Sequence, residues 1–323
     1  MTENPARQTD QDWAGAVPVG RPVAWSNRQG SSQVGAESGG LMAATRQDLS
    51  VPSRSRSARV GRRRLEAVRG HLSERDWAIL ATVAAHRFVT TAQLEAFHFA
   101  GHASQMSGAR VCRRVLERLR RERVLGTLER RVGGIRAGSA SYVWHVDAVG
   151  DRLLRDAEPR RTRRRRYEPS LHFLRHTLAV VDTHLSLLRL SRDGRVELIQ
   201  VDAEPACHRR YPGLGGGTIT LKSDLFAVTV SGEFEDSWFI EVDLATESLP
   251  RLVAKCQEYE AYRRSGVEEA ARGVFPIVVW TIETERRREA LLAAIATDAN
   301  LRSDLYRVIA PDQLGALVSG GAS

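Results

Sequence analysis

Three carboxylates lie close to the ends of two expected strands in the stretch from Lys222 to Ser248. Asp224 stands near the start of the first strand, and Glu241 and Asp243 stand at the end of the second. Glu241 and Asp243 are two residues apart, so their side chains share one face of a regular strand. Clustered carboxylates repel one another and raise each other's pKa unless a cation lies among them. Three interpretations are open: a divalent-metal site, a network of ion pairs, or exposed strand ends without a further role.

Lysine is rare in this chain, and both lysines fall in or just after the same stretch. Only Lys222 and Lys255 are lysines among the 48 basic residues; the others are arginines. A lysine ammonium is a compact charge whose pKa can be tuned beside a metal or a scissile phosphate, unlike a guanidinium. Glu204, just past an expected strand, is a further carboxylate that could join the site. His172 and His176 share a helix face, but no third metal ligand is evident. Surface or packing roles are assigned to them, and one of the two could face the site.

The elements expected around these residues form an α/β layer with a mixed sheet. The layer is needed to bring the strand ends together. The expected order is a helix over 169–191, strands over 195–202, 219–231 and 237–243, a helix over 248–264, a strand over 274–282, a helix and a last strand.

Three helices and a hairpin are expected before this layer. Ser73 caps the first helix, Thr90 or Thr91 caps the second, and the third runs over about 107–123. In the next residues apolar and polar side chains alternate, and a turn is expected at Gly133-Gly134. This pattern is typical of a two-stranded wing. This order describes a winged helix-turn-helix, whose third helix enters the DNA major groove. The candidate DNA-binding residues are Arg110, Arg113, Arg114 and Arg118 on the third helix and Arg131 in the wing.

The charge balance favours a polyanionic partner. The 323 residues carry a formal net charge of +9, as many nucleic-acid-binding proteins do. The run over 160–166 holds six arginines in seven positions; it includes Arg163 and Arg164, which are expected to contact DNA phosphates without sequence preference. The three cysteines are far apart, so no zinc site or disulfide framework is predicted, and a cytoplasmic location is expected. Neither a membrane span nor a signal peptide is predicted.

The order of elements, with Asp224 on the second expected strand and "EVD" ending the third, resembles the PD-(D/E)xK, restriction-endonuclease-like core. The resemblance implies that two carboxylates hold Mg²⁺ or Mn²⁺ and that a lysine two residues after the second carboxylate activates water. That position holds Asp243, so Lys255 or Lys222 could supply the lysine instead. The resemblance thus implies Asp224, Glu241 and Lys255 as catalytic residues and Asp224, Glu241 and Asp243 as metal ligands.

From about Leu72 to Leu317 the chain also resembles the replication-relaxation family of actinobacterial plasmids and integrated elements. The resemblance rests on the order of the segments LSERDWAIL, RVCRRVLERLRRERVL, LRHTLAV, KSDLFAV, FIEVDLATES and KCQEYEAY. It implies a DNA-binding protein of plasmid or mobile-element replication, relaxation or transfer. The activity weighed with it is a Mg²⁺-dependent DNA nickase or nuclease.

The expected organisation is α+β and multidomain. It consists of a disordered tail over 1–58, a winged helix-turn-helix over 59–155, an arginine-rich linker over 156–169 and a PD-(D/E)xK nuclease-like domain over 170–318. The alternative function is a catalytically inactive nuclease-fold accessory protein, or a transcriptional or replication regulator. Double-stranded DNA is the expected partner, and a second copy of the chain or replication and relaxation proteins are further partners considered.

Overall fold

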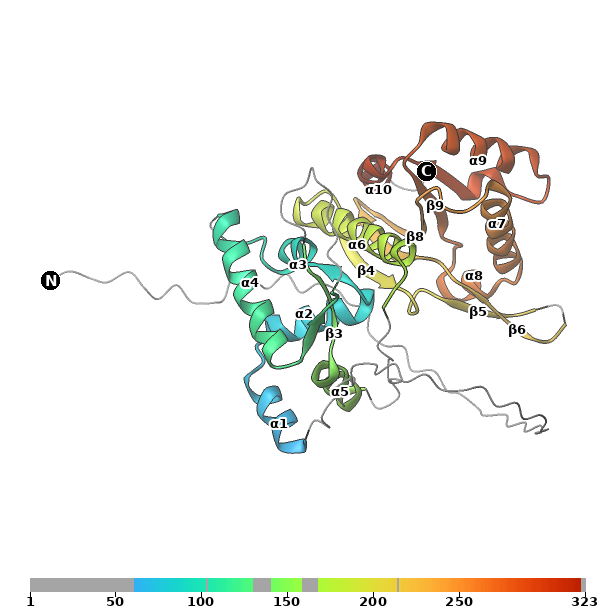
Figure 1. Ribbon diagram of the computed structural model, residues 1–323. Helices are drawn as coiled ribbons and strands as arrows, with labels where there is room; N and C mark the ends of the chain where they lie inside the picture. Colours follow the sequence, from blue (N-terminus) through green and yellow to red (C-terminus); the bar gives the residue numbers. More distant parts are fainter. Residues whose placement is uncertain (1–60, 103, 130–140, 159–167, 214, 321–323) are drawn as a thin grey trace, which may run out of the picture.

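Two groups of elements meet along one central helix, α6 (Leu171–Arg192) (Figure 1). The computed structural model describes residues 61–102, 104–129, 141–158, 168–213 and 215–320. Over these ranges the fold is α+β, as expected, and contains a mixed five-stranded sheet. None of the helices in these ranges is long and apolar enough to cross a membrane.

The N-terminal group is mainly helical. Its elements are α1 (Arg62–His71), α2 (Glu74–His86), β1 (Val89–Thr90), α3 (Thr91–His98), α4 (Gln105–Arg121), β2 (Leu125–Thr127), β3 (Val143–Val146) and α5 (Ala148–Ala157). The strands pair antiparallel in the order β1-β3-β2. Helix starts are set by caps: the side chains of Ser73, Thr90 and Ser104 each accept a hydrogen bond from a backbone N–H three residues later.

Most of the expected N-terminal order is present, but α1, β1 and α5 are additional elements and the start of α4 differs. Helix α4 begins slightly earlier than expected, at Gln105, because Ser104 is its cap. Helix α1 was not expected, because its arginines obscure a short apolar pair, Leu65 and Val68, which is buried. The expected turn at Gly133-Gly134 lies outside the described residues.

The C-terminal group is built on the five-stranded sheet, in the strand order β10-β9-β8-β7-β4. Its elements after α6 are β4 (Glu197–Ala203), β5 (Arg209–Pro212), β6 (Thr218–Leu221), β7 (Leu225–Ser231), β8 (Phe234–Asp243), α7 (Leu249–Arg264), α8 (Val267–Arg272), β9 (Ile277–Ile282), α9 (Glu285–Thr297), β10 (Tyr306–Ile309) and α10 (Leu314–Gly320). Short 3-10 turns cover Ser303–Leu305 and Pro311–Gln313. β4, β7 and β8 pair antiparallel, whereas β8, β9 and β10 pair parallel.

The single strand expected over 219–231 is wrong, because the chain divides there into β6 and β7. β6 pairs with β5 as a separate hairpin, and only β7 joins the main sheet. The buried Ser223 lies at the break: its hydroxyl donates to the Cys207 carbonyl at 3.3 Å, and the Cys207 thiol donates back to the Ser223 carbonyl at 2.8 Å. These contacts tie the segment to the start of the hairpin and leave Asp224 immediately before β7.

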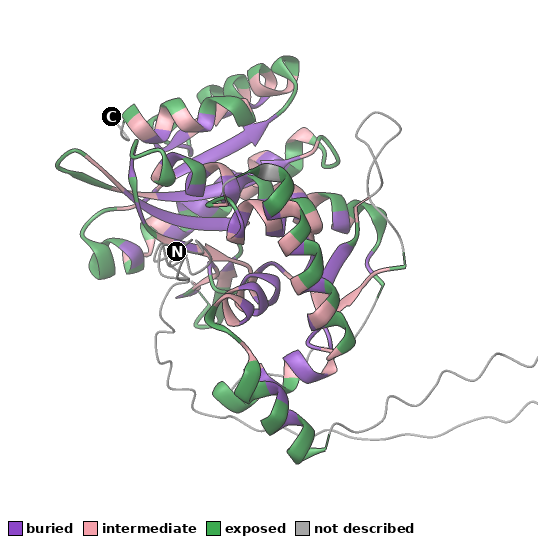
Figure 2. Cartoon of the chain, turned by 90° about the vertical axis from the view of Figure 1, so that its left-hand side faces the viewer, coloured by how far each residue is buried: buried purple, intermediate pink, exposed green. Residues whose placement is uncertain are grey.

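Helices cover both faces of the sheet, so its strands are the most buried part of the C-terminal group (Figure 2). The side chains of β8 alternate: Trp238 and Ile240 join the apolar cluster that includes α6 and α10, whereas Phe239 joins the one that includes α7 and α9. Glu241 is two residues after Phe239, so its side chain lies on the same face of the sheet as that of Phe239. It therefore faces α7.

The helical group is docked on α6 by polar and apolar contacts. Gln93 Nε2 of α3 donates to Asp182 Oδ1 at 2.8 Å, and Arg192 donates to the Ala96 carbonyl at 2.6 Å. The apolar cluster around α6 also continues into α2, α3 and α4. The same helix thus contacts the N-terminal group and covers the sheet.

Candidate functional site

The pairing of β7 with β8 brings Asp224 and Glu241 together. Leu225 lies opposite Ile240 in the antiparallel register, so the residue before β7 meets the end of β8. The Val242 N–H donates to Asp224 Oδ2 at 2.8 Å, which fixes that carboxylate at the strand end. Glu241 is buried, and the charge of Asp224 acts on it.

Lys255 reaches this pair of carboxylates from α7. Its Nζ lies 3.6 Å from Glu241 Oε1, and the hydroxyl of Tyr259, one turn later, donates to the same oxygen. The Lys255 ammonium also donates to the backbone carbonyl of Lys222, whose own side chain is exposed. Of the two lysines it is therefore Lys255 whose ammonium approaches Glu241.

Asp243 does not join this cluster. Both of its oxygens accept hydrogen bonds from Arg287 of α9, one of them at 2.9 Å, and Oδ1 also accepts from the Ala245 N–H at 3.2 Å. Such a two-pronged guanidinium–carboxylate pair is strong and neutralises the charge. Across the described ranges, no three His, Cys, Asp or Glu side chains are grouped to hold a metal ion. The expected trio of carboxylates is thus reduced to the pair Asp224 and Glu241.

His176 belongs to the site; the sequence left open that one of the two histidines faces the site, without indicating which one. Its Nε2 lies 3.2 Å from Asp224 Oδ2 and 3.0 Å from the Val242 carbonyl oxygen. The residue comes from the N-terminal half of α6, on the face of the sheet opposite α7. Its partner His172 on the same helix is exposed, so the helical spacing of the two histidines did not distinguish the site residue from the surface residue.

The electrostatics of the site favour cations on both sides of the carboxylates. Burial lowers the pKa of His176, but the hydrogen bond and charge of Asp224 outweigh burial and raise that pKa to about 9. Burial likewise lowers the pKa of Lys255, and the charge of Glu241 raises it on balance. Burial raises the pKa of Glu241 to about 8, and the charge of Lys255 opposes this only in part. At neutral pH His176 and Lys255 are therefore both charged.

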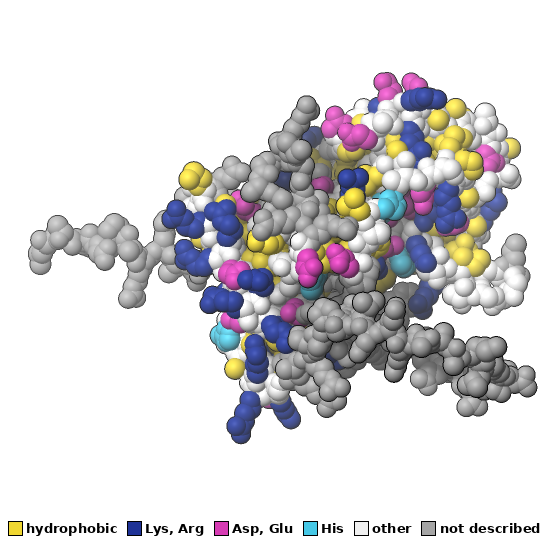
Figure 3. All heavy atoms as spheres, viewed as in Figure 1, with side chains coloured by type: hydrophobic (Ala, Val, Ile, Leu, Met, Phe, Trp, Pro, Cys, Tyr) yellow, Lys and Arg dark blue, Asp and Glu magenta, His cyan; other side chains and the backbone are white. Residues whose placement is uncertain are grey.

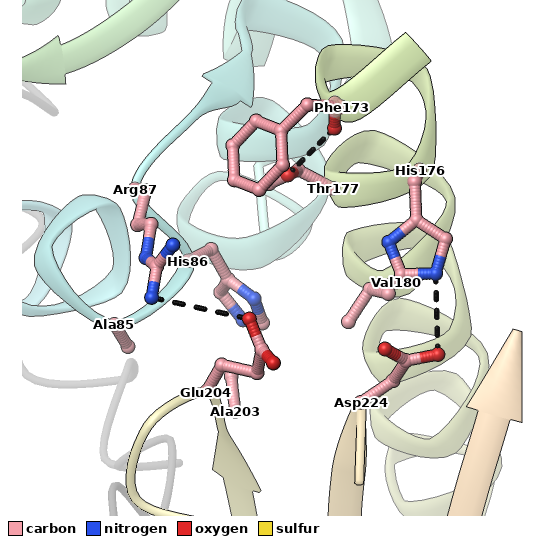
Figure 4. A pocket seen from close by; sticks show the side chains of 10 residues that line it. All are labelled: Ala85, His86, Arg87, Phe173, His176, Thr177, Val180, Ala203, Glu204 and Asp224. Carbon is pink, nitrogen blue, oxygen red and sulfur yellow. Dashed lines mark hydrogen bonds and ion pairs between the residues drawn. The ribbon is translucent and has the colours of Figure 1, made fainter. Parts of the chain in front are cut away.

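A pocket of about 30 Å³ lies beside Asp224 (Figure 4), which is room for about one water molecule. Arg87 of the helical group and Glu204 after β4 face each other across it, 3.9 Å apart. Glu204 also lies 3.2 Å from His208 Nε2. Glu204 therefore adds a carboxylate to the pocket, but its charge is shared with two basic side chains.

Asp224 and Glu241 could hold a hard divalent cation once Glu241 is ionised, because a bound cation favours the charged form of its carboxylate ligands. Asp224 Oδ1 and Glu241 Oε2 accept no hydrogen bond from the described residues, because the donors around them are directed to Oδ2 and Oε1. Mg²⁺ is commonly held by only one or two protein carboxylates, with water and substrate phosphate completing its ligands. The pair can therefore supply the protein's share of a metal site.

A second candidate surface is the outer face of α4. Cys112, Leu116 and Leu119 are buried on its inner face. Arg110, Arg113 and Arg114 are exposed, and no carboxylate of the described chain pairs with them. Figure 3 shows Lys and Arg side chains gathered on the side of the molecule where α4 lies. Unpaired guanidinium groups on an exposed helix suit contact with phosphate.

Arg118 has a different role from the one expected. Its guanidinium donates to Asp76 Oδ1 at 2.6 Å, and Asp76 is 1% exposed and belongs to the capping box of α2. Arg118 therefore holds α4 against α2 and is removed from the set of DNA-contacting candidates. Three further candidates, Arg131, Arg163 and Arg164, lie outside the described residues, as does the expected tail.

The two surfaces lie within one family match. The sequence model of the replication-relaxation family matches residues 80–278, a range that begins in α2, includes α4, α6 and α7, and ends in β9. Neither the curated proteins nor the solved structures gave a match. Because the family match covers more than half of the chain and includes both candidate surfaces, the chain belongs to the replication-relaxation family.

Proposed function

We propose that this protein binds double-stranded DNA through the outer face of α4 and acts in the replication or relaxation of plasmid or other mobile-element DNA. The observation that carries the proposal is the set of three exposed, unpaired arginines on that face, Arg110, Arg113 and Arg114. The order α2, α3, α4, β2, β3 is the one expected for a winged helix-turn-helix, whose last helix enters the major groove. Membership of the replication-relaxation family also supports a role in DNA replication or relaxation.

Duplex binding is tested by replacing Arg110 and Arg114 together with alanine. Both side chains are exposed, so the variant is expected to keep its Tm and to bind duplex DNA more weakly in a fluorescence anisotropy titration. Each phosphate that is no longer neutralised should also flatten the slope of log affinity against log salt by about 0.9. In the control variant, alanine replaces Arg195 and Arg302, which are exposed arginines of the C-terminal group. Equal affinities for both variants would remove α4 from the DNA interface.

A second candidate function is cleavage of one DNA strand at Asp224, Glu241 and Lys255. The specific observation in its favour is the 3.6 Å approach of Lys255 to Glu241, since Asp243 stands where the PD-(D/E)xK pattern has its lysine. The helix and strand order from α6 to β9, with two antiparallel strand pairs followed by a parallel one, supports this candidate.

In this candidate reaction, water attacks the phosphorus atom of a phosphodiester and the bond to one ester oxygen breaks; the attacking water gives up its proton to solvent, and the leaving oxygen takes one up from solvent. Asp224 and Glu241 would hold Mg²⁺ or Mn²⁺, which when bound polarises the phosphoryl oxygens. Lys255 stays protonated, because its pKa is raised on balance by Glu241. It would therefore stabilise negative charge developing at the phosphate and orient the attacking water by donating a hydrogen bond to its oxygen, rather than accept a proton.

Cleavage is tested on supercoiled plasmid with and without Mn²⁺. The wild-type protein is expected to produce nicked circles, and Asp224→Asn and Lys255→Ala are expected to produce none. Binding of the same variants to intact duplex should be unchanged, because α4 is not altered. Full duplex binding without nicking by the wild type would leave the alternative, a nuclease-fold accessory protein of replication.

A further inference from the structure

The charges along α4 are distributed unevenly. From Gln105 to Leu116 the helix contains no carboxylate, and its three arginines are exposed. In the last turns two of the three arginines meet acidic partners: Arg118 pairs with Asp76, and Arg120 pairs with Glu117 at 2.9 Å. Unneutralised positive charge is thus concentrated in the first three turns.

One apolar side chain lies within this charged part. Met106 is 81% exposed, more than any other large hydrophobic residue of the described ranges. Met106, Arg110 and Arg114 are spaced at four-residue intervals, so they form one stripe along the outer face of the helix. The first turn is fixed by the capping box of Ser104 with Ser107, in which the two side chains exchange hydrogen bonds with backbone groups.

The composition of the stripe matches the chemistry of the DNA major groove. Guanine presents two acceptors there that a guanidinium can meet with two hydrogen bonds, and thymine presents the one methyl group of the four bases. Methionine is flexible and polarisable, so it adapts to an apolar contact of this size. Phosphate contacts carry no base information, so the base contacts of such a stripe must come from groups like Met106 that can meet a base edge.

We infer that α4 reads sequence with the stripe Met106, Arg110 and Arg114, and that Met106 contacts the methyl group of a thymine in the target duplex. This inference rests on the proposed DNA binding and deepens it. Arg110 and Arg114 supply contacts to guanine or phosphate, whereas Met106 supplies discrimination for thymine without contributing charge. Removing Met106 should therefore change which duplex is preferred more than how tightly an average duplex is bound.

The inference is tested by selection from a random-sequence duplex library with the full-length protein and with Met106→Ala. The wild type is expected to enrich a motif that contains a required thymine. Met106→Ala should bind unselected duplex as tightly as the wild type but prefer the motif about fourfold less, the ratio for one buried methyl contact. Phe234→Ala, which removes another exposed apolar side chain far from α4 in sequence, is the matched control and should behave as the wild type.

The enriched duplex is then made with uracil in place of the required thymine, which removes only the methyl group. Wild-type affinity should fall about fourfold, whereas Met106→Ala should bind both duplexes equally. Enrichment of no motif by a wild type that binds duplex overturns the inference and leaves the proposed function intact. A motif that Met106→Ala retains, with the same sensitivity to uracil, overturns it as well. Failure of the wild type to bind any duplex overturns both.

Discussion

Glu241 and Asp243 share one face of β8, yet their carboxylates meet cations from different helices. Glu241 Oε1 lies 3.6 Å from Lys255 Nζ of α7, whereas Asp243 is held by Arg287 of α9. The two-residue spacing that suggested a common metal site thus serves two separate purposes. Asp243 fastens α9 to the end of the strand, and Glu241 faces Asp224.

Asp224→Asn is expected to abolish a metal-dependent rise in Tm. An ion that binds only the native state stabilises it by mass action, by about 2.7 kcal/mol at 100 times its Kd. Thermal unfolding of the wild type in Mn²⁺ and in chelator measures the rise. Asp243→Asn should retain the rise from a lower starting Tm, because Asp243 contacts Arg287 instead of the metal pair. If the wild-type Tm is the same in Mn²⁺ and in chelator, the interpretation of the carboxylates as part of an ion-pair network is favoured.

Arg287→Ala is expected to reduce the free energy of unfolding by about 3–5 kcal/mol, because it leaves the buried Asp243 without its cation. Urea unfolding followed by circular dichroism gives the value. The neighbouring Arg286→Ala is the control, since Arg286 is exposed and should change the free energy by less than about 0.5 kcal/mol. Equal stability of the two variants would show that Asp243 is solvated in solution.

Arg118→Ala and Arg113→Ala are expected to separate folding from DNA contact on the same helix. Arg118→Ala removes the donor from a buried carboxylate, Asp76, and should destabilise the fold by about 1–3 kcal/mol. Arg113→Ala should leave the free energy of unfolding unchanged and weaken duplex binding, because its side chain is exposed and unpaired. If Arg113→Ala destabilises the protein as much as Arg118→Ala, the division between the two faces of α4 is wrong.

Local patterns predicted the parts of the site that depend on strand and helix periodicity. Asp224 and Glu241 lie at the ends of two strands joined by a short turn, so their meeting follows from antiparallel pairing alone. The approach of Lys255 to Glu241 could also be predicted, because the helix that follows the strand must pack back on the same sheet. The three residues lie within one strand–strand–helix segment, so their spacing in the sequence is enough to predict that they meet.

Other contacts of the site had no local signal. His176 meets Asp224 only after α6 packs on the opposite face of the sheet. Arg287 is one of many arginines, so composition could not single it out as the partner of Asp243. The break at Ser223 lacks glycine or proline and depends on a contact with Cys207. These three contacts depend on how distant segments pack against one another, and local patterns in one sequence do not indicate that packing.

Deleting 160–166, the arginine run outside the described residues, is expected to flatten the salt dependence of duplex binding. The slope of log affinity against log salt should change by about 0.9 for each phosphate that the run neutralises, and so by several units in total if most of the arginines bind DNA. The sequence preference should stay the same, because phosphate contacts carry no base information. An unaltered slope would mean that the run points away from DNA.

The alkaline limb of the pH–stability profile is expected to depend on His176. Its pKa is raised from 6.5 to about 9 because, although burial opposes protonation, the hydrogen bond and charge of Asp224 favour it. The folded state therefore holds this proton more tightly than the unfolded state. The contribution is complete below pH 6.5 and is lost as pH rises through 9.

Chemical unfolding of the wild type and of His176→Gln at several pH values between about 6 and 10 tests this. The wild type should lose more stability across that window than the variant, because glutamine does not titrate, whereas the raised pKa of Glu241 adds a loss that both proteins share. The buried His86 gives the opposite sign, since burial lowers its pKa from 6.5 to about 4; its effect appears as pH falls below 6.5 and is common to both proteins. A stability advantage of the wild type over His176→Gln that does not shrink as pH rises through 9 would contradict a charged His176 held by Asp224.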